Sequence, residues 1–273
     1  MGNEVTNLFT DVYSRNVSIL KQYGDVQFSI VQLPFVRNSG FEIENFKSKN
    51  SVNEKKLNNN ITRAKSTVRE LGFCNDWEYF FTFTINKQFY DRYNLKDFKK
   101  VLTQWIRDYR KKHNVSIKYL IIPERHQDGA WHFHGFIYGL PVSHLKQFKI
   151  GDQMGAKLAE KVQKGDIVYN WVPYQNKFGF CSLEPIRDKV KAVNYITKYI
   201  SKGFDASVSE LGAHLYFASQ SLTRAEVLKR GTLQCEIPID FENEHCKISI
   251  FDSKQYSTDL LQSIIIGRYD TYD

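Results

Sequence analysis

The chain has 273 residues, which suffices for one catalytic domain with extensions, since domains hold roughly 100 to 200 residues. Its formal net charge of +8 favours a polyanionic partner, because Lys and Arg gain free energy by releasing counterions from a phosphate backbone. No stretch approaches the roughly 20 apolar residues that span a bilayer, and the first residues lack the apolar core of a secretory signal. We therefore expect a soluble, cytoplasmic protein without a membrane partner.

The first 75 residues form a polar stretch rich in Asn and Lys, in which the sequence carries no motif. One apolar run predicts a strand at 26–35, and a charged periodic stretch predicts a helix at 52–71. We expect residues 1–75 to be a basic N-terminal extension of the domain that follows.

Residues 76–204 have the clearest hydrophobic patterning and predict the core domain. The patterns indicate strands at 79–85, 117–123, 131–138, 167–174 and 178–183 and helices at 95–113 and 188–202. An Asp-Gly pair at 128–129 favours a hairpin between the second and third of these strands. The Gly-rich and Lys-rich stretch 149–165 is typical of a loop with a short helix.

This order of elements predicts an α+β fold, in which a central antiparallel sheet carries helices packed on one face, as in ferredoxin-like and RNA-recognition-motif folds. Residues 205–273 are expected to form a C-terminal extension packed on the core. In that extension the patterns indicate strands at 213–218, 232–239 and 247–251 and a short helix at 258–266.

Two histidines stand one strand repeat apart in the segment 131–136. Because successive side chains of a strand point to opposite faces, His132 and His134 share one face and can converge on a divalent ion. Glu124 ends the preceding strand and can reach the same ion across the hairpin, whereas His126 lies in the turn and ranks below it. A carboxylate with two imidazoles suits Mn²⁺ or Mg²⁺, so the sequence predicts this cofactor. A partly buried histidine pair without an ion is the alternative.

The predicted helix at 188–202 carries two tyrosines four residues apart, with a lysine between them. At about 100° per residue, Tyr195, Lys198 and Tyr199 lie away from the apolar stripe. That stripe consists of Val190, Val193, Ile196 and Ile200. A phenol with a pKa near 10 is a poor nucleophile at neutral pH, and an ammonium group can stabilise its anion. We predict Tyr195 and Tyr199 as nucleophiles assisted by Lys198, the alternative being a solvated basic helix.

Together, the segments 132–134 (His-Phe-His) and 195–199 (Tyr-Ile-Thr-Lys-Tyr) resemble the HUH and YxxKY signatures of rolling-circle replication initiators, the Rep endonucleases of small single-stranded DNA phages and related plasmids. The strand segment 81–84 resembles the first motif of that family. The resemblance covers residues 77–202. It implies that Glu124 is the third metal ligand and that the two phenols alternate in successive cleavage and joining steps.

The resemblance also implies a substrate, single-stranded or hairpin origin DNA, and a reaction. One tyrosine attacks a phosphate, keeps a 5′-phosphotyrosyl link and leaves a 3′-hydroxyl for a host polymerase. The sequence contains no GxxxxGK[ST] loop, so we assign unwinding to a separate host helicase. We expect Tyr195 to act first, because Lys198 completes a Tyr-x-x-Lys pattern with it. The site of action is then the cytoplasm of a bacterial host.

Basic residues beside the tyrosines are candidates for holding the DNA strand. We assign this role to Lys191 and Lys202. A second basic set lies on the helix at 95–113 and either follows the DNA backbone or forms a solvated face. It comprises Lys99, Lys100, Arg107, Arg110, Lys111 and Lys112.

Three other functions remain open at this point. A non-catalytic module for single-stranded nucleic acid would stack bases on the same sheet and bind without metal. A metal-dependent phosphohydrolase would use water as its nucleophile and leave no covalent product. A relaxase or transposase would share the tyrosine chemistry on a different substrate.

Overall fold

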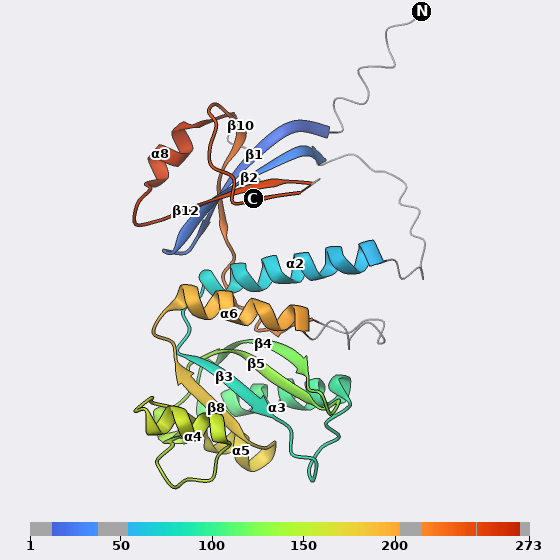
Figure 1. The fold of residues 1–273 in the computed structure, drawn as a ribbon, viewed down its shortest axis with the longest axis vertical. Coiled ribbons are helices and arrows are strands. Elements are labelled where there is room, and N and C mark those ends of the chain that lie inside the picture. The colour runs from blue at the N-terminus through green and yellow to red at the C-terminus, as the bar shows by residue number, and fades with distance from the viewer. Residues whose placement is uncertain (1–12, 38–53, 203–214, 244, 268–273) are drawn as a thin grey trace, which may run out of the picture. The chain divides into compact units, whose positions relative to one another are not determined.

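The structure is a computed structural model, and it divides into two compact units (Figure 1). The described residues are 13–37, 54–202, 215–243 and 245–267. One unit comprises Met1–Val52 and Arg224–Asp273, here called the terminal unit, and the other comprises Asn53–Thr223, here called the central unit. We expected boundaries at 75 and 205 instead. The division differs because strands from the two ends of the chain pair in one sheet and because helix 54–73 packs within the central unit.

The central unit is built on a seven-stranded antiparallel sheet in the order β6-β7-β8-β3-β5-β4-β9. Its strands are β3 Tyr79–Thr84, β4 Lys118–Arg125, β5 Trp131–Tyr138, β6 Leu145–Gln147, β7 Tyr169–Trp171, β8 Cys181–Pro185 and β9 Phe217–Ala218. β3 lies in the middle of this order, between β8 and β5. The expected α+β class with an antiparallel sheet is confirmed.

Helix α3 (Leu95–His113) covers one face of this sheet. The Asn94 side chain caps its N-terminus by accepting a hydrogen bond from the Asp97 N–H at 3.1 Å, and four basic residues in the last turn suit the negative end of the helix dipole. Its apolar side packs into the largest core cluster of the described residues, where Phe98 stacks on Phe133 with ring centroids 5.2 Å apart. This face is therefore the hydrophobic core.

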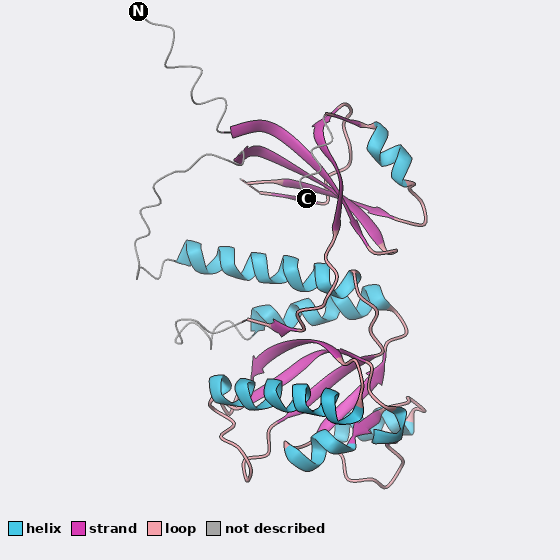
Figure 2. Cartoon of the chain, turned by 180° about the vertical axis from the view of Figure 1, so that it is seen from behind, coloured by secondary structure: helices cyan, strands magenta, loops and turns pink. Residues whose placement is uncertain are grey.

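Helices α2 (Glu54–Phe73) and α6 (Lys189–Lys202) lie on the other face (Figure 2). Helices thus cover both faces of the sheet, whereas the sequence led us to expect them on one face. The two helices pack closely, since a Cβ atom at Gly72 would lie only 2.7 Å from a Val193 methyl carbon. The difference arises because α2, taken for part of an extension, supplies a second apolar surface through Val68.

Short elements complete the central unit: η1 Val142–His144, α4 Ala156–Gln163 and α5 Val172–Lys177. The strand expected at 167–174 is only partly right, because β7 ends at Trp171 and α5 follows at once. Pro173 stands in the first turn of α5, where its missing N–H costs nothing. The strand expected at 178–183 is displaced to 181–185, behind Gly179 at φ +136°.

The terminal unit is a six-stranded antiparallel sheet in the order β11-β12-β2-β1-β10-β13. Its elements are β1 Tyr13–Tyr23, β2 Gln27–Arg37, β10 Glu226–Leu233, β11 Phe241–Glu242, β12 Lys247–Asp252, α8 Thr258–Ser263 and β13 Ile265–Ile266. The strand expected at 232–239 is displaced to 226–233, and the start of the one expected at 213–218 lies outside the described residues. α8 contributes Leu261 to a small core with Leu20, Ile30 and Phe251.

Among the described residues, none of the helices is both long enough and apolar enough to span a bilayer.

Candidate active site

The register of three central strands places the predicted site on the face covered by α6. Thr82 on β3 and Ile122 on β4 are the partners of His134, and Glu124 is the partner of His132. Side chains alternate along a strand, so both histidines and Glu124 share this face, as the sequence predicted. At Gly135, on the opposite face, an added Cβ would lie 2.2 Å from the Leu120 carbonyl oxygen, so only glycine fits there.

His134 is buried and held at both ring nitrogens. Its Nε2 lies 2.8 Å from Glu124 Oε2, and its Nδ1 lies 3.2 Å from Thr82 Oγ1. Two partners fix the orientation of an imidazole and leave it little freedom to rotate. Glu124 and His134 therefore form an ordered carboxylate–imidazole pair.

His132 is not part of the pair formed by Glu124 and His134. Its ring stacks on His126 with centroids 4.2 Å apart. Burial, together with the smaller effect of the charges of His126 and His134, lowers the pKa of His132 to about 4. His132 is thus neutral at pH 7, which is the form that binds metal ions.

The predicted metal ligands are only partly assembled. Glu124 and His134 meet, and their carboxylate and imidazole chemistry suits a divalent ion. Within the described ranges, however, no three His, Cys, Asp or Glu side chains are grouped as a metal centre. His132 shares the face and the register position but stacks on His126 instead of joining the pair.

The two tyrosines of α6 meet at this pair. The Tyr199 ring stacks on His134 with centroids 4.0 Å apart, and its hydroxyl donates a hydrogen bond of 2.6 Å to the Tyr195 hydroxyl. Tyr195 is 49% exposed and Tyr199 only 8%. The expectation that both lie away from the core is therefore wrong for Tyr199. Position 199 flanks the apolar stripe one turn beyond Ile196 and packs on the sheet.

The pKa of the Tyr199 hydroxyl is raised above its usual range. Burial is the largest cause, followed by the hydrogen bond to Tyr195 and by the charges of Glu124 and Glu184. Tyr199 therefore keeps its proton at neutral pH and acts as a donor.

Phe80 is a site residue that the sequence analysis missed. Its ring stacks on His134 with centroids 6.1 Å apart and meets the Tyr195 ring edge-on at 5.6 Å. Alternation along β3 places it on the same face as Thr82, and this parity is the signal that could have found it.

A cleft of about 640 Å³ opens beside the tyrosines and is called the central cleft. It is lined by Phe80, Thr82, Lys161, Glu184, Pro185, Ile186, Arg187, Asp188, Lys191, Ala192, Asn194, Tyr195, Lys198 and Tyr199. Four of these residues are basic, and none of the basic side chains is buried. The cleft therefore brings together phenols, an aromatic ring and cations. Sites for single-stranded nucleic acid combine aromatic rings that stack on bases with cations that contact phosphates.

The basic residues of the central cleft differ in their partners. Lys161 pairs with Glu184 at 2.7 Å and Lys191 with Asp188 at 3.2 Å. Lys198 is exposed and forms no ion pair with another residue of the described part. Lys191 and Lys198 thus lie where the sequence predicted, beside Tyr195, while the side chain of Lys202 lies outside the described residues.

The basic set of α3 lies on the opposite side of the sheet from the tyrosines. Part of it is used in packing, since the Lys99 ammonium lies 5.4 Å from the Phe217 ring centroid and Arg110 donates to the Ser219 hydroxyl at 3.1 Å. This set does not line the central cleft.

The central unit therefore has the features of a nucleic-acid-processing protein: a basic cleft, two phenols in contact and an ordered carboxylate–imidazole pair. The sequence profile of the family described as "Replication-associated protein ORF2/G2P" matches residues 78–204, just under half of the chain. The matched stretch contains the site described above and supports a replication initiator of the rolling-circle class. No curated protein and no solved structure is significantly similar to the chain.

Proposed function

We propose that the central unit nicks and rejoins single-stranded DNA at a replication origin, as a two-tyrosine initiator of the HUH type. One observation carries the proposal. The Tyr195 and Tyr199 hydroxyls are 2.6 Å apart, and the Tyr199 ring stacks on His134, which in turn contacts Glu124 at 2.8 Å. Nucleophiles and a carboxylate–imidazole pair from distant parts of the sequence thus meet at the edge of a basic cleft.

Tyr195 is the first nucleophile. It is exposed, lines the central cleft and accepts the hydrogen bond that Tyr199 donates. A donor at the phenol oxygen stabilises the negative charge that develops there as the proton leaves. Lys198, which lines the same cleft, adds an ammonium group that neutralises charge on the phosphate.

In the first step the Tyr195 oxygen bonds to phosphorus and the bond from phosphorus to the 3′ oxygen breaks. The phenol loses a proton, and the 3′ oxygen gains one to become a hydroxyl. The protein then carries a 5′-phosphotyrosyl link, so no ATP is needed for rejoining. In a second cycle Tyr199 attacks the regenerated origin, and the freed 3′-hydroxyl displaces Tyr195 from its link.

Glu124, His132 and His134 would hold a Mn²⁺ or Mg²⁺ ion, which polarises the phosphoryl group when bound. The contact between Glu124 and His134 supports this assignment, and His132 supplies the third ligand, a neutral imidazole, once its ring leaves His126. Thr82 orients the His134 ring through Nδ1. The DNA partner is a single-stranded or hairpin origin, and a host helicase and polymerase in the bacterial cytoplasm complete replication.

The proposal is tested by incubating the full chain with labelled single-stranded DNA that carries candidate origins, in Mn²⁺ or in EDTA. Denaturing gels should show the fragment downstream of the nick linked to the protein through its 5′ phosphate, and only with the ion. Tyr195→Phe should slow the first cleavage at least about 10³-fold, because the nucleophile is lost, and Tyr199→Phe should slow it less than about tenfold. Tyr138→Phe, on an exposed tyrosine outside the cleft, is the matched control.

Other outcomes would overturn parts of the proposal. Cleavage without an adduct would indicate a water nucleophile. Retarded but uncut DNA under every condition would favour a binding module. Loss of the first cleavage in Tyr199→Phe, with Tyr195→Phe active, would reverse the order of the two phenols.

A further inference from the structure

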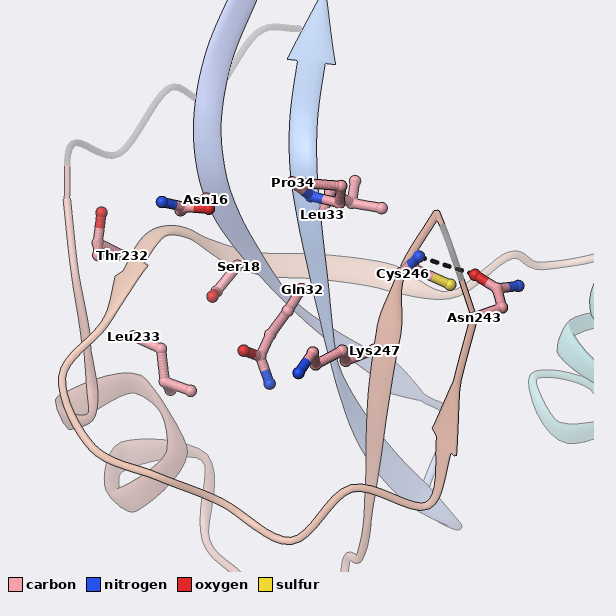
Figure 3. A pocket seen from close by; sticks show the side chains of 10 residues that line it. All are labelled: Asn16, Ser18, Gln32, Leu33, Pro34, Thr232, Leu233, Asn243, Cys246 and Lys247. Carbon is pink, nitrogen blue, oxygen red and sulfur yellow. Dashed lines mark hydrogen bonds between the residues drawn. The ribbon is translucent and has the colours of Figure 1, made fainter.

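A second pocket lies in the terminal unit and has no part in the proposed reaction (Figure 3). Its volume is about 360 Å³, which falls in the usual range of ligand sites. It is lined by Asn16, Ser18, Gln32, Leu33, Pro34, Thr232, Leu233, Asn243, Cys246 and Lys247. We call it the terminal pocket.

The floor of the terminal pocket is a row of side chains across three neighbouring strands. Gln32 on β2 is the register partner of both Ser18 on β1 and Lys247 on β12. At roughly 4.8 Å between strands, the row is about 10 Å long. The next positions on the same face include the buried core residues Leu20 and Ile30. The sheet face therefore changes from apolar to hydrogen-bonding at this row.

The floor has unmet hydrogen-bonding capacity. Ser18 is only 2% exposed and Gln32 is partly buried, whereas Asn16 is exposed. None of these three side chains forms a hydrogen bond with another described residue. Figure 3 shows the Gln32 amide and the Lys247 ammonium extending in the same direction from adjacent strands. Side chains without a partner in the protein can exchange bound water for the donors and acceptors of a ligand.

The walls of the terminal pocket are apolar or rigid. Pro34 and Leu233 supply aliphatic surface. At one end the backbone N–H of Cys246 donates to the Asn243 side-chain oxygen at 2.8 Å, and the Asn243 N–H donates to the Cys246 carbonyl at 3.0 Å. A flat ligand can thus lie between aliphatic walls with its edge on the polar floor.

The charge of the terminal unit restricts the class of ligand. Its residues include 11 Lys and Arg against 14 Asp and Glu, a net charge of −3. The lysine of the pocket already pairs with an acid, since Lys247 lies 2.9 Å from Glu242. Such a surface does not attract a phosphate backbone, so the recognised part of the ligand is uncharged.

We infer that the terminal pocket binds a single nucleobase. Amide and hydroxyl groups complement the donors and acceptors on base edges, and aliphatic side chains can cover the faces of an unstacked base. Gln32, Ser18 and Asn16 supply the hydrogen bonds, while Pro34 and Leu233 cover the faces of the base. The base belongs either to an unpaired DNA strand or to a free nucleotide.

The test uses the full chain and two kinds of probe, the four deoxynucleoside monophosphates and the four labelled ten-nucleotide homopolymers. Titration calorimetry should detect one preferred monophosphate, or fluorescence anisotropy one preferred homopolymer. The first result identifies a free nucleotide as the source of the base, and the second identifies a DNA strand. Gln32→Leu and Ser18→Ala should each weaken the preferred probe about tenfold, because each removes a hydrogen bond to the base.

Gln262→Leu, on α8 and outside the pocket, is the matched control and should leave binding unchanged. Thermal unfolding checks that each variant folds. Equal binding of all probes by wild type and Gln32→Leu would overturn the inference, as would binding of N-acetylated amino-acid amides in place of nucleotides. DNA cleavage assayed on the same variants should be unchanged with a fixed origin oligonucleotide, so that failure of the pocket and failure of the tyrosine chemistry are told apart.

Discussion

The two units of the chain differ in charge and in the size of their cores. The central unit has 27 Lys and Arg against 16 Asp and Glu, a net charge of +11, whereas the terminal unit is net negative. Among the described residues, the main core cluster of the central unit has 21 buried members, many of them aromatic, and that of the terminal unit has six. The positive charge of the whole chain thus belongs to the unit with the larger core.

This difference fits the different tasks that we propose for the two units. Phosphate attraction and nucleophile placement need cations and a rigid sheet, and both lie in the central unit. The terminal unit offers neutral hydrogen-bonding groups on a small sheet, which suits selection among ligands more than attraction of a polyanion.

The largest expected effect concerns the two cores. Phe133→Ala removes a ring that stacks on Phe98 on the sheet face opposite the tyrosines, and it should lower the free energy of unfolding of the central unit by about 3–5 kcal/mol. Phe251→Ala lies in the smaller core and its side chain is 7% exposed, so it should cost the terminal unit less, about 3 kcal/mol. Urea unfolding followed by fluorescence and circular dichroism should show two transitions. Equal shifts of both transitions in either variant would mean that the units unfold as one.

A smaller effect separates the units by charge. Replacing Lys161, Arg187 and Lys191 by Gln should weaken single-stranded DNA binding about 10- to 100-fold at 0.15 M salt and reduce the salt slope by about 2, because up to three phosphate contacts are lost. The matched triple change in the terminal unit, at Lys21, Arg230 and Lys254, should alter affinity less than about twofold. Anisotropy titrations at several salt concentrations measure both. A stronger effect of the terminal set would break the assignment of DNA affinity to the central unit.

Local sequence signals predicted several elements of the central unit. The helix expected at 95–113 and the strand expected at 131–138 have the bounds of α3 and β5, since each has strong periodicity and a clear end signal, an Asn cap or a Gly turn. The convergence of Glu124 and His134 followed from strand parity and the hairpin alone.

Features that depend on distant parts of the chain were missed. β1 was not expected, because polar residues interrupt the apolar residues of its sequence. Its pairing with β10 also joins positions some 200 residues apart. The burial of Tyr199 and the roles of Phe80 and Glu184 depend on how α6 packs on the sheet. The stacking of His132 on His126 depends on the side-chain rotamers of the two residues, which a sequence pattern does not predict.

The smallest expected effect is a pH dependence confined to the central unit. Because the pKa of His132 is about 4 in the folded chain and about 6.5 when unfolded, the unfolded chain binds more protons between these values. The resulting stability is complete above pH 6.5 and is lost as the pH falls toward 4. His132 is only half-buried, so solvent screening limits the effect to about 1 kcal/mol.

Urea unfolding in EDTA between pH 7.5 and 4.5 measures this dependence. As the pH falls over this range, the free energy of unfolding of the central unit should decrease by about 1 kcal/mol more in wild type than in His132→Gln. The variant has no imidazole at this position to protonate. The terminal transition should be unaffected, and His245→Gln in the terminal unit should leave the central slope unchanged. An equal pH slope in wild type and His132→Gln would mean that His132 is solvated and easily protonated in the folded chain. A metal ion would then have to displace the proton of His132 before the imidazole could bind it.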